Sequence, residues 1–129
     1  MPRLEKKDLL EWFKQGEKQK EKWKIGTEHE KFVFHLDSLE RVGYFGKSGV
    51  GELLNKLAEE NNWDKVLENN NTIALKDETG ASISLEPGGQ LELSGTLLDN
   101  LHQTCKETGR HLKIMKEAMK DLGLSMIGL

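Results

Sequence analysis

The feature that most constrains the fold is residues 83–95, ISLEPGGQLELSG, in which two alternating runs flank a Pro-Gly-Gly turn. Successive side chains of a strand point to opposite faces of a sheet. A three-residue loop places Glu86 opposite Gln90 and Ser84 opposite Glu92, and it leaves only isoleucine and leucine on the other face. A two-residue loop would mix the faces. The segment therefore predicts a β-hairpin with one apolar face and one polar, acidic face.

A second acidic strand is predicted for residues 25–36, IGTEHEKFVFHL. The period of two puts Glu28 and Glu30 on one face of this strand. Apolar side chains occur on both of its faces, which indicates an interior strand rather than an edge strand. If this strand lies beside the hairpin, its two glutamates and the two of the hairpin form a cluster of four carboxylates.

The rest of the pattern predicts helices and further strands, bounded by glycines and capping residues. We expect helices over residues 4–16, 48–61 and 96–122, and strands over residues 63–67, 72–76, 81–86 and 124–129. This mixture predicts an α+β fold in a single domain, residues 1–129, because the chain is long enough for one core but not for two.

The longest helix is expected to begin after Thr96, with Asp99 in the capping-box position, and to end at Gly123. Its apolar stripe makes Cys105 a buried structural thiol rather than a nucleophile, and leaves His111 on the helix surface. The stripe comprises Leu97, Leu98, Leu101, Cys105, Leu112, Met115, Met119 and Leu122.

Composition excludes several classes of protein. The chain is 36% hydrophobic and 32% charged, as expected for a water-soluble domain, and its net charge of −3 gives no electrostatic footprint for nucleic acid. No apolar run is long enough for a membrane span, so we expect no membrane partner. With a single cysteine and no apolar leader at the N-terminus, the expected location is cytoplasmic.

Converging glutamates repel one another and lose hydration, so they are retained where a cation or a charged substrate offsets that cost. Oxygen ligands of this kind suit Mg²⁺, especially Mg²⁺ carried on substrate phosphates. Glu28, Glu30, Glu86 and Glu92 are therefore the predicted metal ligands. The alternative is an exposed strand and an ordinary hairpin whose glutamates are simply solvated.

These acidic segments resemble the plant- and proteobacterial-type glutamate–cysteine ligases. The resemblance extends over nearly the whole chain from about Asp8, and it is carried by EKWKIGTEHEKF (21–32), WDKV (63–66), ISLEPGGQLELSG (83–95) and LHQTC (101–105). It implies a fold related to glutamine synthetase, with a curved, mostly antiparallel sheet and flanking helices, of which this chain forms the N-terminal part.

The resemblance also implies a reaction. ATP with Mg²⁺ phosphorylates the γ-carboxylate of L-glutamate, and the amine of L-cysteine attacks the acyl phosphate to give γ-glutamylcysteine, the first step of glutathione synthesis. The four glutamates match the acidic strands of the metal site. Thr27 and Gln90 are the expected substrate-binding residues, and no catalytic residue is assigned.

Length is where the chain departs from that family, whose members are about three times as long. The arginines for glutamate and the ATP phosphates are expected beyond Leu129, so we expect this piece alone to be inactive, and to pair with the rest of a ligase chain or with itself. Two alternatives stay open: a ligase that joins glutamate to another amine, and a non-catalytic truncated paralogue or subunit.

Overall fold

Six strands form one antiparallel sheet in the computed structural model, which describes residues 3–128. Their order across the sheet is β2-β3-β4-β5-β1-β6. The strands are β1 (Glu28–His35), β2 (Asp64–Glu68), β3 (Asn71–Lys76), β4 (Ser82–Leu85), β5 (Gln90–Ser94) and β6 (Leu124–Ile127). The helices are α1 (Lys6–Gln15), the short 3-10 helix η1 (Lys20–Lys22), α2 (Val50–Asn61) and α3 (Leu101–Leu122). The α+β prediction is confirmed.

The β4–β5 hairpin has the predicted register. Ser84 pairs with Glu92, and the Glu86 amide donates to the Gln90 carbonyl at 2.8 Å across the three-residue turn. Gly89 in that turn has φ +86°, a conformation that a residue with a side chain rarely adopts. Strand β1 lies between β5 and β6, so the prediction of an interior strand is also confirmed.

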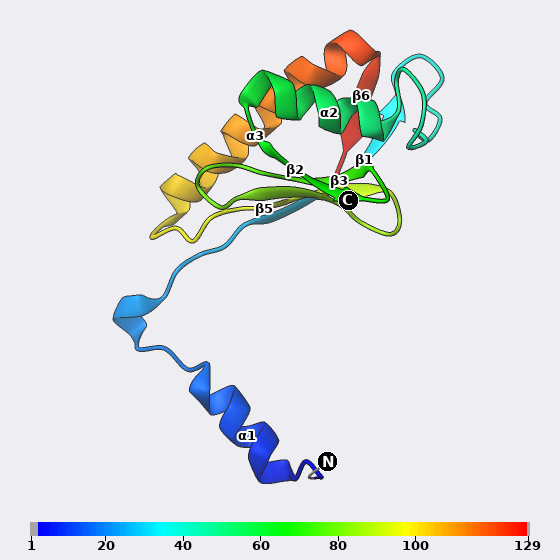
Figure 1. The fold of residues 1–129 in the computed structure, drawn as a ribbon. Coiled ribbons are helices and arrows are strands. Elements are labelled where there is room, and N and C mark those ends of the chain that lie inside the picture. The colour runs from blue at the N-terminus through cyan, green and yellow to red at the C-terminus, as the bar shows by residue number, and fades with distance from the viewer. Residues whose placement is uncertain (1–2, 129) are drawn as a thin grey trace.

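The core lies between the sheet and α2 and α3, which both cover the same face (Figure 1). Lys56 on α2 joins the two helices: its ammonium lies 2.6 Å from Glu60 on α2 and 2.9 Å from Asp121 on α3. The buried side chains that fill this layer include Val33, Leu53, Leu54, Leu57, Leu75, Ile83, Leu91, Leu93, Met115, Ala118 and Met119. In the described part of the chain, no helix covers the opposite face of the sheet (Figure 1).

The predicted start of the long helix is wrong. Helix α3 begins at Leu101, and its N-cap is Asn100, whose side chain accepts from the Gln103 amide at 3.1 Å. The segment after Thr96 remains extended because Leu98 continues the sheet by pairing with Ile25. The end at Gly123 is confirmed, with φ +65°.

The predicted apolar stripe of α3 is correct only in its C-terminal half. Met115 and Met119 are buried, but Leu101 and Cys105 are exposed, which corrects the interpretation of Cys105 as a buried thiol. His111, expected on the surface, is only 7% exposed. The helix turns its His111, Met115 and Ala118 positions toward the sheet, so its buried face is rotated from the run of leucines.

The N-terminal helix α1 forms as predicted and ends at Gly16, but it packs on nothing in the described structure. It lies apart from the sheet, at the end of an extended connection (Figure 1). Its apolar side chains face solvent: Leu9, Trp12 and Phe13 are 52%, 74% and 76% exposed. Within residues 3–128, no helix combines the length and apolarity that crossing a bilayer requires.

Candidate functional site

The acidic residues gather on the sheet face that the helices leave uncovered. Strands β1 and β5 pair Glu30 with Glu92 and Glu28 with Ser94. The Cβ atoms of directly paired residues lie about 4.5–5.5 Å apart, so Glu30 and Glu92 are immediate neighbours. Strands β1 and β5 are thus adjacent, which was the condition for the acidic residues to lie together, although the segment between them contains α2 and three other strands.

Glu86 lies on the same face at the turn end of the hairpin. The Ser84 hydroxyl donates to the Glu86 carboxylate at 3.1 Å, and Ser84 itself pairs with Glu92. From Glu86 to Glu28, however, the sheet extends two strands across and four residues along, roughly 16 Å from the strand spacing and rise. The four carboxylates therefore share a face but not one point.

The spacing bears on metal binding. Among residues 3–128, no three or more His, Cys, Asp or Glu side chains lie close enough together to hold a metal ion. The single four-carboxylate cluster that was expected does not form in the described structure: the register of β4, β5 and β1 places the acids in a row. Their roles as individual ligands of Mg²⁺ stay predictions.

The chemistry of the donors nevertheless fits Mg²⁺. Glu28 and Glu30 are exposed, Glu86 and Glu92 are half-buried, and within residues 3–128 none of the four forms an ion pair with a lysine or arginine. The Ser94 hydroxyl donates to the Glu92 carboxylate at 3.1 Å. This face thus presents carboxylate oxygens that are not engaged in ion pairs among the described residues, and such oxygens can attract a cation bound to phosphates.

The two predicted substrate contacts separate. Gln90 lies on the acidic face, opposite Phe32, and its side-chain oxygen packs so closely on the turn that a Cβ at Gly88 would lie 2.1 Å from it. Thr27 precedes Glu28 and so points to the other face, where its hydroxyl is buried without a hydrogen-bond partner among the described residues. The geometry keeps Gln90 at the candidate site and removes Thr27 from it.

Sequence reasoning missed Arg41. The backbone of this residue forms an isolated antiparallel β-bridge with Phe34. Arg41 also lines a hollow beside the Pro-Gly-Gly turn, together with Glu86 and Phe32. A guanidinium at this place can pair with phosphate oxygens bidentately. No local motif surrounds Arg41 in the sequence, so only the pairing of distant segments reveals its position.

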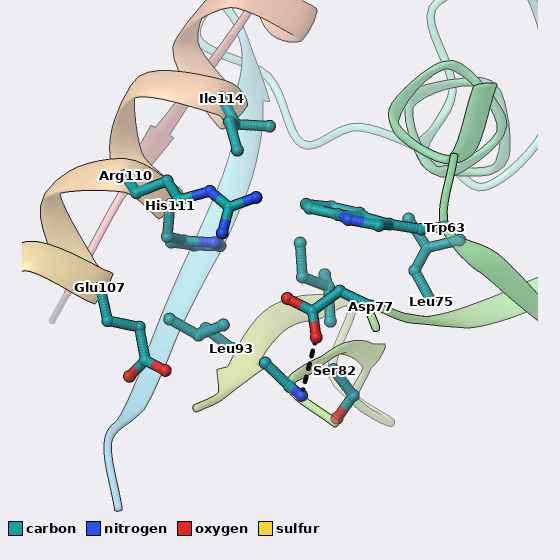
Figure 2. A pocket seen from close by; sticks show the side chains of 11 residues that line it. Trp63, Leu75, Asp77, Ser82, Leu93, Glu107, Arg110, His111 and Ile114 are labelled. Atoms are coloured by element: carbon teal, nitrogen blue, oxygen red, sulfur yellow. Dashed lines mark hydrogen bonds between the residues drawn. The ribbon is translucent and has the colours of Figure 1, made fainter. Parts of the chain in front are cut away.

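A second cavity lies on the helix-covered face. Figure 2 shows Trp63 and Arg110 facing each other across it, with His111 beside Arg110 and Asp77 opposite. Its floor is apolar and includes Leu93. The cavity is separated from the acidic residues by the sheet itself, so it is a different place from the candidate site.

Two histidines lie against each other on the helix-covered side of β1. The ring centroids of His29 on β1 and His111 on α3 are 6.3 Å apart in an edge-to-face arrangement. Burial, followed by the nearby charges of His29 and Lys31, lowers the pKa of His111 to about 4, while Glu107 opposes that shift. Burial and the Lys31 charge also lower the pKa of His29. Both rings are therefore neutral near pH 7.

Comparison with known proteins supplies a family. The model of Glutamate-cysteine ligase family 2 (GCS2) matches residues 24–129. The chain is 49% identical over 126 residues to the chloroplastic glutamate–cysteine ligase of Medicago truncatula, covering 98% of this chain and 24% of that protein. It is 48% identical to chloroplastic glutamate–cysteine ligase B of Oryza sativa subsp. japonica (98% and 25% covered) and 44% identical to the Arabidopsis thaliana protein (98% and 23%).

The chain thus spans about a quarter of the length of the curated relatives that it matches. Those relatives are named chloroplastic, which contradicts the expectation of a cytoplasmic protein. The error came from interpreting the N-terminus of a 129-residue sequence as informative about targeting, when its relatives are about four times as long.

Proposed function

The chain belongs to glutamate-cysteine ligase family 2, and from that premise we propose that the full-length protein joins L-glutamate to L-cysteine with cleavage of ATP. The product is γ-glutamylcysteine, the precursor of glutathione. The observation that carries this proposal is the register that sets Glu30 beside Glu92 on the helix-free face.

The reaction balances in two transfers. An oxygen of the glutamate γ-carboxylate attacks the γ-phosphorus of ATP, and ADP leaves. The amine of cysteine then attacks the activated carbonyl carbon, phosphate leaves with the C–O bonding pair, and the nitrogen loses a proton as the amide forms. Mg²⁺, when bound, would neutralise charge on the phosphate oxygens during the first transfer.

The chain's own residues would bind and orient in this scheme. Glu30 and Glu92 would hold the metal-bearing phosphates against the sheet, with Glu28 and Glu86 at either end of the row. The Ser94 hydroxyl fixes one oxygen of Glu92 and so leaves the other for a ligand. Phosphoryl transfer asks a protein mainly for such positioning and charge stabilisation.

The direct experiment measures product formation by the full-length protein with Glu30→Gln and Glu92→Gln. Each change removes a charged ligand but keeps the side chain's shape. We expect kcat/KM to fall about 100-fold or more and the Mg²⁺ concentration for half-maximal rate to rise. Glu78→Gln, in the exposed β3–β4 turn, is the matched control and should retain wild-type activity.

Mass spectrometry of the product separates this reaction from its alternatives. Faster formation of a glutamyl amide other than γ-glutamylcysteine would assign another amine acceptor. Activity that is insensitive to both substitutions would reject the acidic face as the site. Absence of any ATP-dependent product would favour a non-catalytic subunit.

A further inference from the structure

Glu107 ties helix α3 to the end of strand β5. One of its carboxylate oxygens, Oε1, accepts from the Thr96 amide at 2.8 Å and from the Thr96 hydroxyl at 2.9 Å. Thr96 lies two residues after Ser94, the last residue of β5, and Glu107 lies in the N-terminal half of α3. Glu107 also lines the cavity of Figure 2, where its carboxylate points away from the Arg110 guanidinium.

Gly95 fits against the same carboxylate. A Cβ at this position would lie 2.2 Å from Oε2 of Glu107, so any side chain here would displace the carboxylate from Thr96. The Gly95 amide donates to the Thr27 carbonyl at 2.7 Å, which extends the β1–β5 ladder by one step. The Glu107 carboxylate therefore packs directly on the Gly95 backbone, and a side chain at this position would have to move it.

These contacts lead directly to the acidic face. Ser94, next to Gly95, pairs with Glu28 on β1 and donates its hydroxyl to Glu92. A shift of Gly95 or Thr96 would therefore move the residues that face Glu28 and hold Glu92. Glu107 itself lies on the opposite side of the sheet and cannot touch a ligand bound to the acidic face.

We propose that Glu107 is a positioning residue for the acidic face: by holding Thr96 and packing on Gly95, it fixes the junction of β1 and β5 and thereby Glu28 and Glu92. The link to catalysis rests on the proposed ligase function, whereas the fixing of the strand ends does not. Substitution of residues that orient metal ligands without touching the metal commonly changes metal affinity about 10–100-fold.

The first measurement is amide hydrogen exchange in the full-length protein. Glu107→Ala should raise exchange in residues 26–30 and 91–95 by about tenfold, because local opening of the ladder becomes easier. Glu117→Ala is the matched control, since Glu117 lies on the same helix, is 66% exposed and, among residues 3–128, forms an ion pair only with Lys113, at 4.0 Å. Equal exchange in the two variants would overturn the proposal.

The second measurement is the dependence of rate on Mg²⁺. Glu107→Ala should raise the half-maximal Mg²⁺ concentration about tenfold while changing kcat at saturating Mg²⁺ about twofold at most. Glu107→Gln retains an oxygen acceptor for both Thr96 donors and should restore the wild-type requirement. Faster exchange with an unchanged Mg²⁺ requirement would reduce Glu107 to a purely structural residue and overturn its role at the site.

One further variant and one further outcome complete the test of this proposal. Thr96→Val removes only the hydroxyl donor and is expected to fold, so it should shift both measurements in the same direction by a smaller factor; no shift would contradict the proposal. If wild-type protein forms no γ-glutamylcysteine, the proposed ligase function fails, and the exchange rates alone then decide whether Glu107 fixes the strand ends.

Discussion

At the scale of single residues, the sheet separates groups that are adjacent in the sequence. Glu28 and Glu30 point to the open face, while Thr27 and His29, which alternate with them in the sequence, point to the helices. Four consecutive residues thus serve two environments with opposite requirements. The open face holds charges in water, and the covered face holds polar atoms that must be neutral or hydrogen-bonded.

His111 makes this difference measurable. Its pKa is lowered to about 4 in the fold, chiefly by burial, and rises to its usual value of 6.5 on unfolding. The unfolded chain therefore binds the extra proton between these values, so stability is complete above pH 6.5 and is lost as the pH falls toward 4. The loss is roughly 3 kcal/mol if His111 acts alone.

Urea denaturation at pH 7.5 and pH 5 measures that loss. Wild-type protein should be less stable at pH 5, and His111→Gln should show a smaller difference between the two pH values. His102→Gln is the control, because His102 is exposed on the same helix. A pH dependence that is the same in wild type and His111→Gln would contradict the assignment.

At the scale of elements, the sequence specifies the hairpin much better than the long helix. Alternation between faces admits one loop length in residues 83–95, so the β4–β5 register followed directly. For α3, the spacing of the leucines near its start is the same as that of a buried stripe, yet Leu101 is 69% exposed. The spacing of apolar residues shows where a helix could bury side chains, but which of them are buried depends on which side of the helix packs against the sheet.

The candidate site was also predictable only in part. Each acidic pair was evident from its own strand, because alternation is local. The pairing of Glu30 with Glu92 joins segments that no turn connects, so their relative register depends on the complete sheet. The position of Arg41 beside Glu86 depends on the same long-range packing, whereas Glu107 reaches Thr96 across the short connection between β5 and α3; neither residue lies in an acidic motif.

Two glycines of α3 provide a matched test of the helix boundaries. Gly123 ends the helix with φ +65°, so Gly123→Ala should lower stability by about 1 kcal/mol. Gly109 lies inside the same helix with no atom within 4 Å of an added Cβ, so Gly109→Ala should raise stability by about 0.5–1 kcal/mol. Thermal unfolding of both variants gives the signs, and a stabilising Gly123→Ala would contradict the observed C-cap.

At the scale of the whole molecule, much apolar surface lacks a partner. Helix α1 exposes Trp12 and Phe13, and the connection after it exposes Trp23, which is 65% accessible. Within residues 3–128, the sheet also has two unpaired edge strands, β2 and β6, and a face that no helix covers. In relatives about four times as long, further chain is available to pack against such surfaces.

The 129-residue chain on its own should therefore self-associate. Exposed aromatic residues and open strand edges each favour contact between copies, and a net charge of −3 opposes it only weakly. Sedimentation velocity should show a weight-average mass that increases with concentration above that of a 14.7 kDa monomer. Replacing Trp12 and Phe13 with glutamate should reduce the increase if α1 carries the contact, whereas Lys7→Glu, on the same helix, should reduce it less. A single monomeric species at high concentration would show that the exposed surface does not drive association.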